Sequence, residues 1–214
     1  SLPNHSSVRS LITSSKGEVY AGGFNELGII EKQATGDYIY RSLLKDLDLE
    51  GMELENLWQV HEYKDYIIFR SFNELIAISG NTATHISANN SFVHSGIVNN
   101  RFFVQDAGFG IMEFNPEEMR LSRIFDFGRG SVVGFLPSGL QNELMVMTRE
   151  GSVFKMNLKN NDVYLWKQVL DNENQGQIIS AIKFEDDYLL VTLGSKIIVM
   201  TQDCELIRNP SAFK

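Results

Sequence analysis

The sequence is poor in cysteine, in proline and in clusters of positive charge. Its single cysteine, Cys204, excludes an internal disulfide and gives no indication of the redox compartment. Only 4 prolines stand against 17 glycines, which favours many tight turns over stiff linkers. The net charge is −8 and the sequence contains no cluster of Lys and Arg, so we expect no nucleic-acid partner for this domain.

Long apolar runs are also missing. No stretch approaches the roughly 20 apolar residues that a membrane-spanning helix needs, so we expect no membrane insertion within these residues. The chain begins Ser1-Leu2-Pro3-Asn4, without Met and without the charged and apolar regions of a signal peptide. We therefore expect a processed protein or a piece of a longer one, with any export signal or anchor outside this sequence.

The residues that are present favour strands. The chain contains 14 Phe, 7 Tyr and 2 Trp, and with Val and Ile these residues prefer β-structure. The tetrapeptide Phe24-Asn25-Glu26-Leu27 returns as Phe72-Asn73-Glu74-Leu75, each time between two short apolar runs. Such a recurrence indicates an internal repeat. In each copy we expect Phe to pack between repeats, Asn and Glu to shape a turn, and Leu to begin the next strand.

A strand–turn–strand pattern occurs five times along the chain. Its first strands are centred on Tyr20, Ile68, Phe103, Met145 and Leu190, at separations of 48, 35, 42 and 45 residues. A small apolar stretch precedes each hairpin and a more polar stretch follows it. Four short strands in a unit of about 43 residues are typical of a β-propeller blade.

The sequence therefore predicts an all-β fold, a β-propeller of about five four-stranded blades. We expect a single domain over residues 1–214, with blades near 5–50, 51–90, 91–128, 129–175 and 176–214. A truncated part of a larger propeller stays open as an alternative, and it would expose two apolar blade faces. A β-sandwich, a leucine-rich solenoid and helical repeats fit less well, because none of them repeats a four-stranded unit of this length.

The expected innermost strands carry little catalytic chemistry. A glycosidase needs two carboxylates facing each other near the channel, but Glu62 and Glu185 only end their strands. The other polar candidates on or beside these strands are Arg9, Gln59, His61, His94 and Ser95. His61 and His94 either face the channel or are hydrogen-bonded core residues, and we favour the second interpretation. We predict no catalytic residue and no enzymatic activity for the propeller itself.

Metal and cofactor motifs are incomplete. Asp46 to Gly51 begins like a calcium loop, but its twelfth position is Leu57, where a bidentate carboxylate is required. The histidines His5, His61, His85 and His94 lack zinc spacing among themselves or with Cys204. We therefore predict neither a metal site nor a cofactor. Trp58 and Trp166 could each stack on a sugar, although packing between blades is the favoured role, and no binding residue is assigned.

The first blade also resembles a known family. Leu2-Pro3-Asn4 and Ser7-Val8 form a lead-in, residues 16–22 read "KGEVYAG", and Leu27-Gly28-Ile29-Ile30 follow. This pattern resembles the blades of the bacterial two-component regulator propeller, particularly in sensors that carry a triple-tyrosine module after the propeller. Residues 103–115, "FVQDAGFGIMEFN", repeat the pattern in the third blade, whereas the second, fourth and fifth blades match only in their strand pattern.

The resemblance implies a sensor. In that family, common in gut Bacteroidetes, the propeller is the periplasmic part of a membrane-anchored regulator with kinase or DNA-binding output domains across the membrane. It implies a non-catalytic domain that responds to an oligosaccharide or similar ligand, as a homodimer or in contact with an adjacent propeller domain. No ligand-binding residue is carried over. A protein-interaction scaffold and, less favoured, a lyase or glycosidase propeller remain as alternatives.

Overall fold

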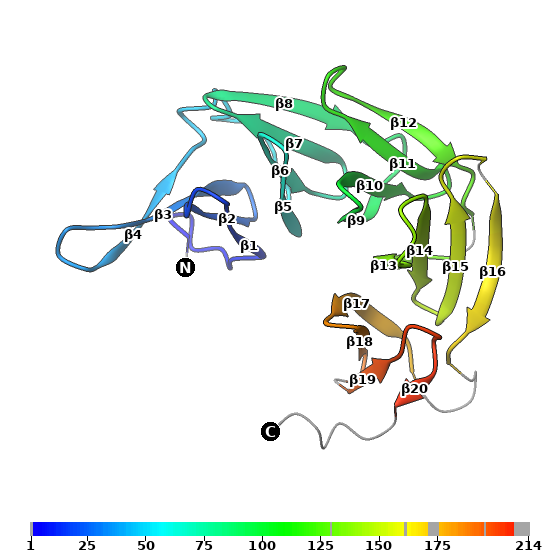
Figure 1. The fold of residues 1–214 in the computed structure, drawn as a ribbon. Helices are drawn as coiled ribbons and strands as arrows, with labels where there is room; N and C mark the ends of the chain where they lie inside the picture. Colours follow the sequence, from blue (N-terminus) through cyan, green and yellow to red (C-terminus); the bar gives the residue numbers. More distant parts are fainter. Residues whose placement is uncertain (1, 129, 161, 171–175, 195, 208–214) are drawn as a thin grey trace. The chain divides into compact units, whose positions relative to one another are not determined.

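The computed structural model describes residues 2–128, 130–160, 162–170, 176–194 and 196–207. Its regular elements within these ranges are all β-strands, labelled in Figure 1. No helix in the described ranges is long and apolar enough to span a membrane.

The strands form five antiparallel sheets of four strands each. The first sheet contains β1 (Ser10–Thr13), β2 (Val19–Gly23), β3 (Glu26–Lys32) and β4 (Tyr38–Ser42). The second contains β5 (Gln59–Tyr63), β6 (Tyr66–Arg70), β7 (Glu74–Ser79) and β8 (Thr82–Ser87). The third contains β9 (Phe92–Val98), β10 (Arg101–Asp106), β11 (Gly110–Asn115) and β12 (Arg120–Phe125).

The remaining two sheets continue the series. The fourth contains β13 (Val132–Pro137), β14 (Glu143–Thr148), β15 (Ser152–Asn157) and β16 (Val163–Gln168). The fifth contains β17 (Ile178–Phe184), β18 (Asp187–Thr192), β19 (Ile197–Met200) and the short β20 (Leu206–Ile207). Every sheet keeps its strands in chain order, so that the first strand forms one edge and the fourth the other. Five four-stranded antiparallel blades of a β-propeller are confirmed.

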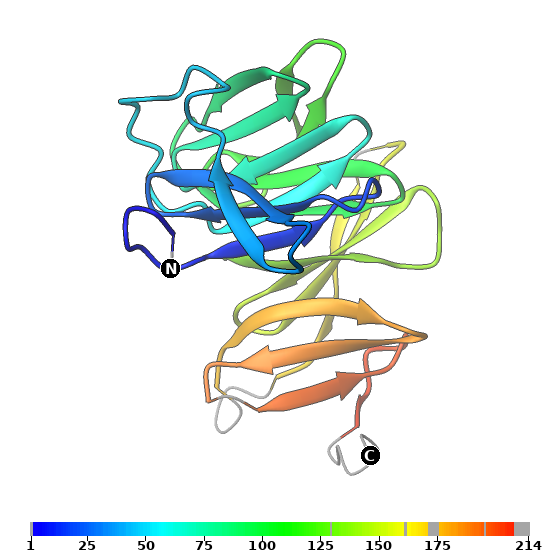
Figure 2. The same cartoon turned by 90° about the vertical axis from the view of Figure 1, so that its left-hand side faces the viewer.

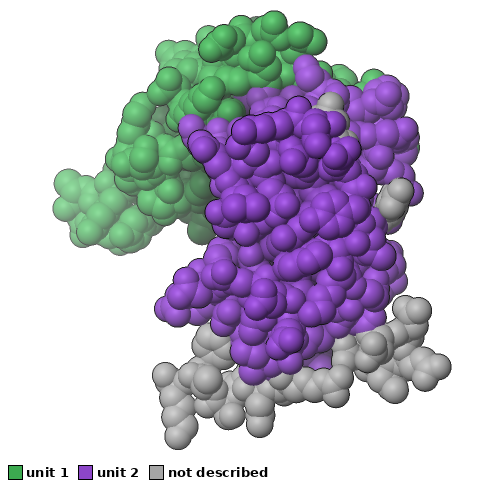
Figure 3. All heavy atoms as spheres, turned by 45° about the vertical axis from the view of Figure 1, so that its right-hand side comes forward, with its two compact units in different colours: residues 1–92, 115–121 green, residues 93–114, 122–214 purple. Residues whose placement is uncertain are grey.

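The contacts divide the chain into two compact units, coloured in Figure 3. Unit 1 comprises residues 1–92 and 115–121, and it contains the first two sheets. Unit 2 comprises residues 93–114 and 122–214, and it contains most of the third sheet together with the fourth and fifth.

The core of unit 1 lies where the first two sheets stack on each other. Leu27 of the first sheet packs with Phe69 and Ile76 of the second, and the connection between the sheets adds Leu54. Gly22 allows the close approach, because a Cβ at this position would lie 2.9 Å from the Phe69 ring. The two sheets therefore bury one continuous apolar layer that holds unit 1 together.

Unit 2 repeats the arrangement twice. One apolar cluster joins the third and fourth sheets through residues such as Phe103 and Phe154, and a second joins the fourth and fifth through Met145 and Leu190. On the other face of the last sheet, drawn in orange in Figure 2, cross-strand pairing aligns four apolar residues: Ile182, Leu189, Val199 and Ile207.

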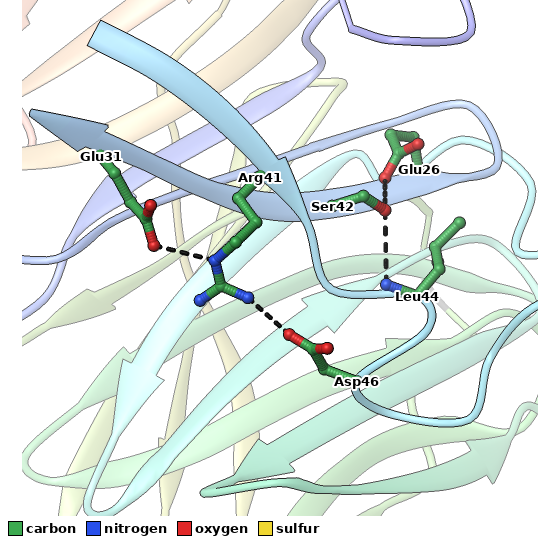
Figure 4. A network of polar contacts seen from close by, with 6 residues as sticks. All are labelled: Glu26, Glu31, Arg41, Ser42, Leu44 and Asp46. Carbon is green, nitrogen blue, oxygen red and sulfur yellow. Dashed lines mark hydrogen bonds and ion pairs between the residues drawn. The ribbon is translucent and has the colours of Figure 1, made fainter. Parts of the chain in front are cut away.

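The repeated tetrapeptide forms the turn between the second and third strands in the first two sheets. Asn25 adopts a left-handed backbone with φ 48°, and its Oδ1 accepts a hydrogen bond from the Leu54 amide at 2.7 Å. Glu26 is buried and accepts hydrogen bonds from the hydroxyls of Tyr40 and Ser42, the second of which is drawn in Figure 4. In the second copy, Glu74 pairs with His85 at 2.6 Å. Asn25 therefore has the turn-forming role predicted for it, whereas Glu26 and Glu74 begin the third strands and their side chains bond to the fourth strands.

The two leucines and the two phenylalanines of the repeat differ in burial. Leu27 and Leu75 lie in the third strands, as predicted, and both are fully buried. Packing of the phenylalanines between blades was a wrong prediction, because Phe24 is 49% exposed and Phe72 is 44% exposed. Each Phe lies in a turn at a strand end, and its side chain projects past the apolar layer that the sheets bury.

This difference predicts unequal costs for two substitutions within one motif. Leu27→Ala removes buried methyl groups and should lower the free energy of unfolding by about 2–5 kcal/mol. Phe24→Ala should lower it by about 1 kcal/mol or less, because the ring is half exposed in the folded state. Urea unfolding of the two variants measures both values. An equal or larger loss for Phe24→Ala would show that this ring is packed between the sheets.

Candidate functional site

Three aromatic side chains gather where β2 and β6 end in unit 1. Phe24 forms an isolated bridge with Asn56, two residues before Trp58, which brings Phe24 and Trp58 to the same end of the sheets. Trp58 packs against Phe72 with 5.7 Å between the ring centroids. Phe24, Trp58 and Phe72 are 49%, 36% and 44% exposed. We call these three residues the aromatic surface.

Two arginines flank the aromatic surface. The guanidinium of Arg9 lies 5.1 Å from the centroid of the Trp58 ring, and its Nε donates a hydrogen bond to Asn56 Oδ1 at 3.3 Å. The guanidinium of Arg70 lies 5.8 Å from the Phe72 ring, but the Arg70 side chain is buried. Each aromatic ring in this pair therefore has a cation within the range of a cation–π interaction.

Arg70 is held by neutral acceptors. Its Nε donates to Gln59 Oε1 at 2.8 Å, and its Nη1 donates to the Phe92 carbonyl at 2.7 Å. Burial lowers the pKa of Arg70 to about 10, because the charged form loses hydration. The group still carries its charge at neutral pH. It therefore places a poorly hydrated positive charge behind Phe72.

The two tryptophans, for which the sequence predicts the same role, lie in different environments. Trp166 packs against the core of the fourth and fifth sheets, with Lys155 Nζ 3.8 Å from its ring centroid, so the favoured packing role is confirmed. For Trp58 the favoured role is wrong. The alternation of Asn56, buried Leu57 and Trp58 is the sequence signal that could have indicated an outward-facing ring.

A polar groove lies at the opposite ends of the same strands. It has a volume of about 340 Å³ and is bordered by the β1–β2, β5–β6 and β7–β8 turns. Its lining includes charges of both signs, on Lys16, Glu18, Arg41, Asp46, Glu62, Lys64 and Asp65.

Several of the groove's polar groups already have partners. Arg41 pairs with both Glu31 and Asp46, as Figure 4 shows, and Glu62 accepts hydrogen bonds from the Ser15 amide and hydroxyl at 2.7 and 2.6 Å. Burial and a hydrogen bond to Glu18 raise the pKa of Tyr20 to about 12, so its hydroxyl stays neutral and donates. Of these contacts, the one between Glu62 and Ser15 joins the first sheet to the second, whereas Arg41 and Tyr20 bond within the first sheet and the connection after it.

The metal-like motif takes part in this ion pairing. Asp46 uses its carboxylate on Arg41, and Leu57, at the position that a calcium loop fills with a carboxylate, is fully buried in the core. In the described ranges, no three His, Cys, Asp or Glu side chains are grouped so that they could hold a metal ion. Cys204 is buried, and burial raises its thiol pKa to about 11.

The inner-strand candidates lie on the first strands of the second and third sheets. His61 and Gln59 belong to β5 in unit 1, whereas His94 and Ser95 belong to β9 and lie in unit 2. Both histidines are half-buried, and the His94 ring lies 5.7 Å from the Phe135 ring. Burial, with a smaller contribution from Arg70, lowers the pKa of His61 to about 4. His61 is therefore neutral at pH 7.

The fold has counterparts among solved structures. No protein family matches the sequence, and no curated protein does either. Virginiamycin B lyase from Staphylococcus aureus is 14% identical with a TM-score of 0.69, over 97% of this chain and 72% of the lyase chain. The WD40 β-propeller domain of Doa1 is 13% identical with a TM-score of 0.69, over 95% and 69% of the two chains. PorZ of Porphyromonas gingivalis is 15% identical with a TM-score of 0.67, over 94% of this chain and 28% of PorZ.

These matches agree on the fold alone. The three proteins include an enzyme and a surface component of a secretion system, at identities of 13–15%. One architecture thus supports unrelated activities, and no functional residue passes from these proteins to this chain. The candidate site is therefore taken from the geometry of the described residues.

The pKa of His61 makes stability depend on pH. An unfolded His has a pKa near 6.5, whereas His61 in the folded protein has a pKa of about 4. Between these two pH values the unfolded chain therefore binds a proton at His61 and the folded chain does not. We expect the free energy of unfolding to fall by about 1–3 kcal/mol through this window.

The test compares His61→Gln with the control His5→Asn, which replaces an exposed residue by one that tolerates its left-handed backbone. Urea unfolding at pH 7 and at pH 4.5 should show a smaller loss for His61→Gln than for the control. An identical loss in both variants would mean that His61 titrates normally in the folded protein.

Proposed function

We propose that this chain is a non-catalytic ligand-sensing propeller, the extracytoplasmic part of a bacterial signal-transduction regulator that responds to an oligosaccharide. The observation that carries the proposal is the aromatic surface. Exposed aromatic rings flanked by hydrogen-bonding side chains suit sugars, because a pyranose presents an apolar C–H face to the ring and hydroxyls around its rim.

The surroundings of the rings supply these polar groups. Asn56 and Arg9 lie beside Trp58, and Asn73 follows Phe72 in the turn, where its Nδ2 donates to Glu55 Oε1 at 2.7 Å. All of these residues belong to unit 1, so the proposed site needs nothing from unit 2. The surface is made by turns anchored on buried leucines, and a rigid base of this kind limits the entropy lost on binding.

The cellular context in the proposal rests on the resemblance of the first and third blades to two-component regulator propellers. A sensor of this kind transmits a signal when a bound ligand favours one packing arrangement of the domain against its neighbours. PorZ, described as a bacterial surface component of a secretion system, is an example of a related fold outside the cell. An extracytoplasmic location is compatible with the single buried cysteine, which needs no disulfide partner.

A glycan array followed by titration calorimetry tests the proposal. We expect at least one oligosaccharide to bind, and Trp58→Ala to weaken its binding about tenfold or more, which corresponds to about 1.4 kcal/mol. The matched control is Tyr164→Ala, which removes a 49% exposed aromatic ring from β16 in unit 2 and should leave the affinity unchanged.

Two results would contradict the proposal. One is the absence of binding to every glycan together with co-purification of a protein partner, which would favour an interaction scaffold. The other is an equal loss of affinity in Trp58→Ala and Tyr164→Ala, which would place the site elsewhere on the molecule.

A further inference from the structure

Arg9 is held in place at the edge of the aromatic surface. Its backbone amide donates to the Gly22 carbonyl at 2.8 Å, which fixes the residue beside the end of β2. Its Nε donates to Asn56 and its guanidinium lies over Trp58, so the side chain is held at two further points. The residue is nevertheless exposed. A long side chain that is already ordered loses little entropy when it binds a ligand.

The held orientation leaves the outer part of the guanidinium unused. Among the described residues, Nε is the only side-chain nitrogen of Arg9 with a hydrogen-bond partner, and both Nη groups have none. Arginine recognises oxyanions by donating two parallel hydrogen bonds to two oxygens of one group. The side chain is thus preorganised for a carboxylate or a sulfate.

The arginines beside the aromatic surface differ from others in the molecule. Arg41, Arg101 and Arg120 each form an ion pair with a glutamate, namely Glu31, Glu113 and Glu118. Within the described residues, neither Arg9 nor Arg70 forms an ion pair with a carboxylate. Two guanidinium groups without a direct ion-pair partner among the described residues therefore lie at this end of unit 1, in a chain whose net charge is −8.

Arg70, the second of these arginines, is buried, and its charge is therefore less screened by water. Among the described residues, Arg70 contacts neutral acceptors and the Phe72 ring, so an anion bound in front of that ring would favour its charged form. Glu55 also lies at this end, where its carboxylate accepts a hydrogen bond from Asn73 and forms no ion pair with Arg9 or Arg70 within the described residues.

We propose that the aromatic surface is specific for acidic oligosaccharides, whose sugar packs against the exposed parts of Trp58 and Phe72 while a carboxylate or sulfate binds the Nη groups of Arg9. This inference rests on the proposed function and adds the chemical class of the ligand. A uronate carboxylate and a sulfate ester can each present two oxygens of one group to the two Nη groups of Arg9, and the experiment distinguishes the two sources.

Matched pairs of ligands test the specificity. The first pair is tetragalacturonate and its methyl-esterified form, in which methyl groups replace the negative charges of the carboxylates. The second pair is a chondroitin sulfate tetrasaccharide and its desulfated form. Titration calorimetry at low ionic strength should show one acidic member binding about tenfold tighter than its neutral or desulfated partner. This ratio should shrink as salt is added.

Three variants then assign the effect to a residue. Arg9→Gln should reduce the affinity for the acidic ligand about tenfold and leave the neutral ligand unchanged. Arg9→Lys should restore only part of the affinity, because an ammonium cannot donate two parallel hydrogen bonds. The control Arg120→Gln removes an exposed arginine that is already paired with Glu118, and it should change neither affinity. Thermal unfolding of each variant confirms that the exposed substitutions leave the fold intact.

The failures of the two proposals are distinguishable. Equal affinity for the two members of each pair overturns the acidic specificity and leaves oligosaccharide sensing intact. An unchanged acidic affinity in Arg9→Gln overturns the role of Arg9. The absence of binding to any of the four ligands and to every glycan on the array overturns both proposals.

Discussion

The face-to-face stacking of small sheets is the constraint on which the rest of the structure depends. In unit 1, Gly22 allows the first sheet to approach Phe69, and Leu27 and Ile76 complete the apolar layer. Because this layer uses the sheet faces, the strand ends are left to present other side chains. The turn residues Phe24 and Phe72 therefore lie outside the core although they belong to the same motif as buried leucines.

The two ends of the strands in unit 1 differ in chemistry. At one end, polar side chains of the groove bond to one another or to neighbouring residues: Arg41 pairs with Glu31 and Asp46, and Glu62 accepts a hydrogen bond from Ser15. At the other end, aromatic rings remain exposed and two guanidinium groups lack acidic partners among the described residues. Satisfied polar groups stabilise the contact between sheets, whereas unsatisfied and exposed groups are the ones that a ligand can use. This contrast is the reason for locating recognition at the aromatic end.

Much of the fold could be predicted from the sequence, because strand pairs recur at similar separations and a four-stranded unit has few stable arrangements. The fate of single aromatic residues could not. Trp58 and Trp166 cannot be distinguished by residue type, yet Trp58 is exposed and Trp166 packs on a core. Their burial depends on which sheet covers each position. The contact between Arg9 and Trp58 joins residues far apart in the chain, and neither residue belongs to a motif that would associate them. Chain-distant pairs of this kind appear only when the first two sheets are stacked.

The central claim is that the stacked sheets of unit 1 present Trp58 to solvent as part of a recognition surface. The most direct measurement is acrylamide quenching of Trp58 fluorescence in a Trp166→Phe variant, since the chain has only 2 tryptophans. The account predicts red-shifted emission that acrylamide quenches readily, and protection from quenching when a bound oligosaccharide covers the ring. Blue-shifted emission that resists acrylamide in the free protein would show that Trp58 is buried and would contradict the account.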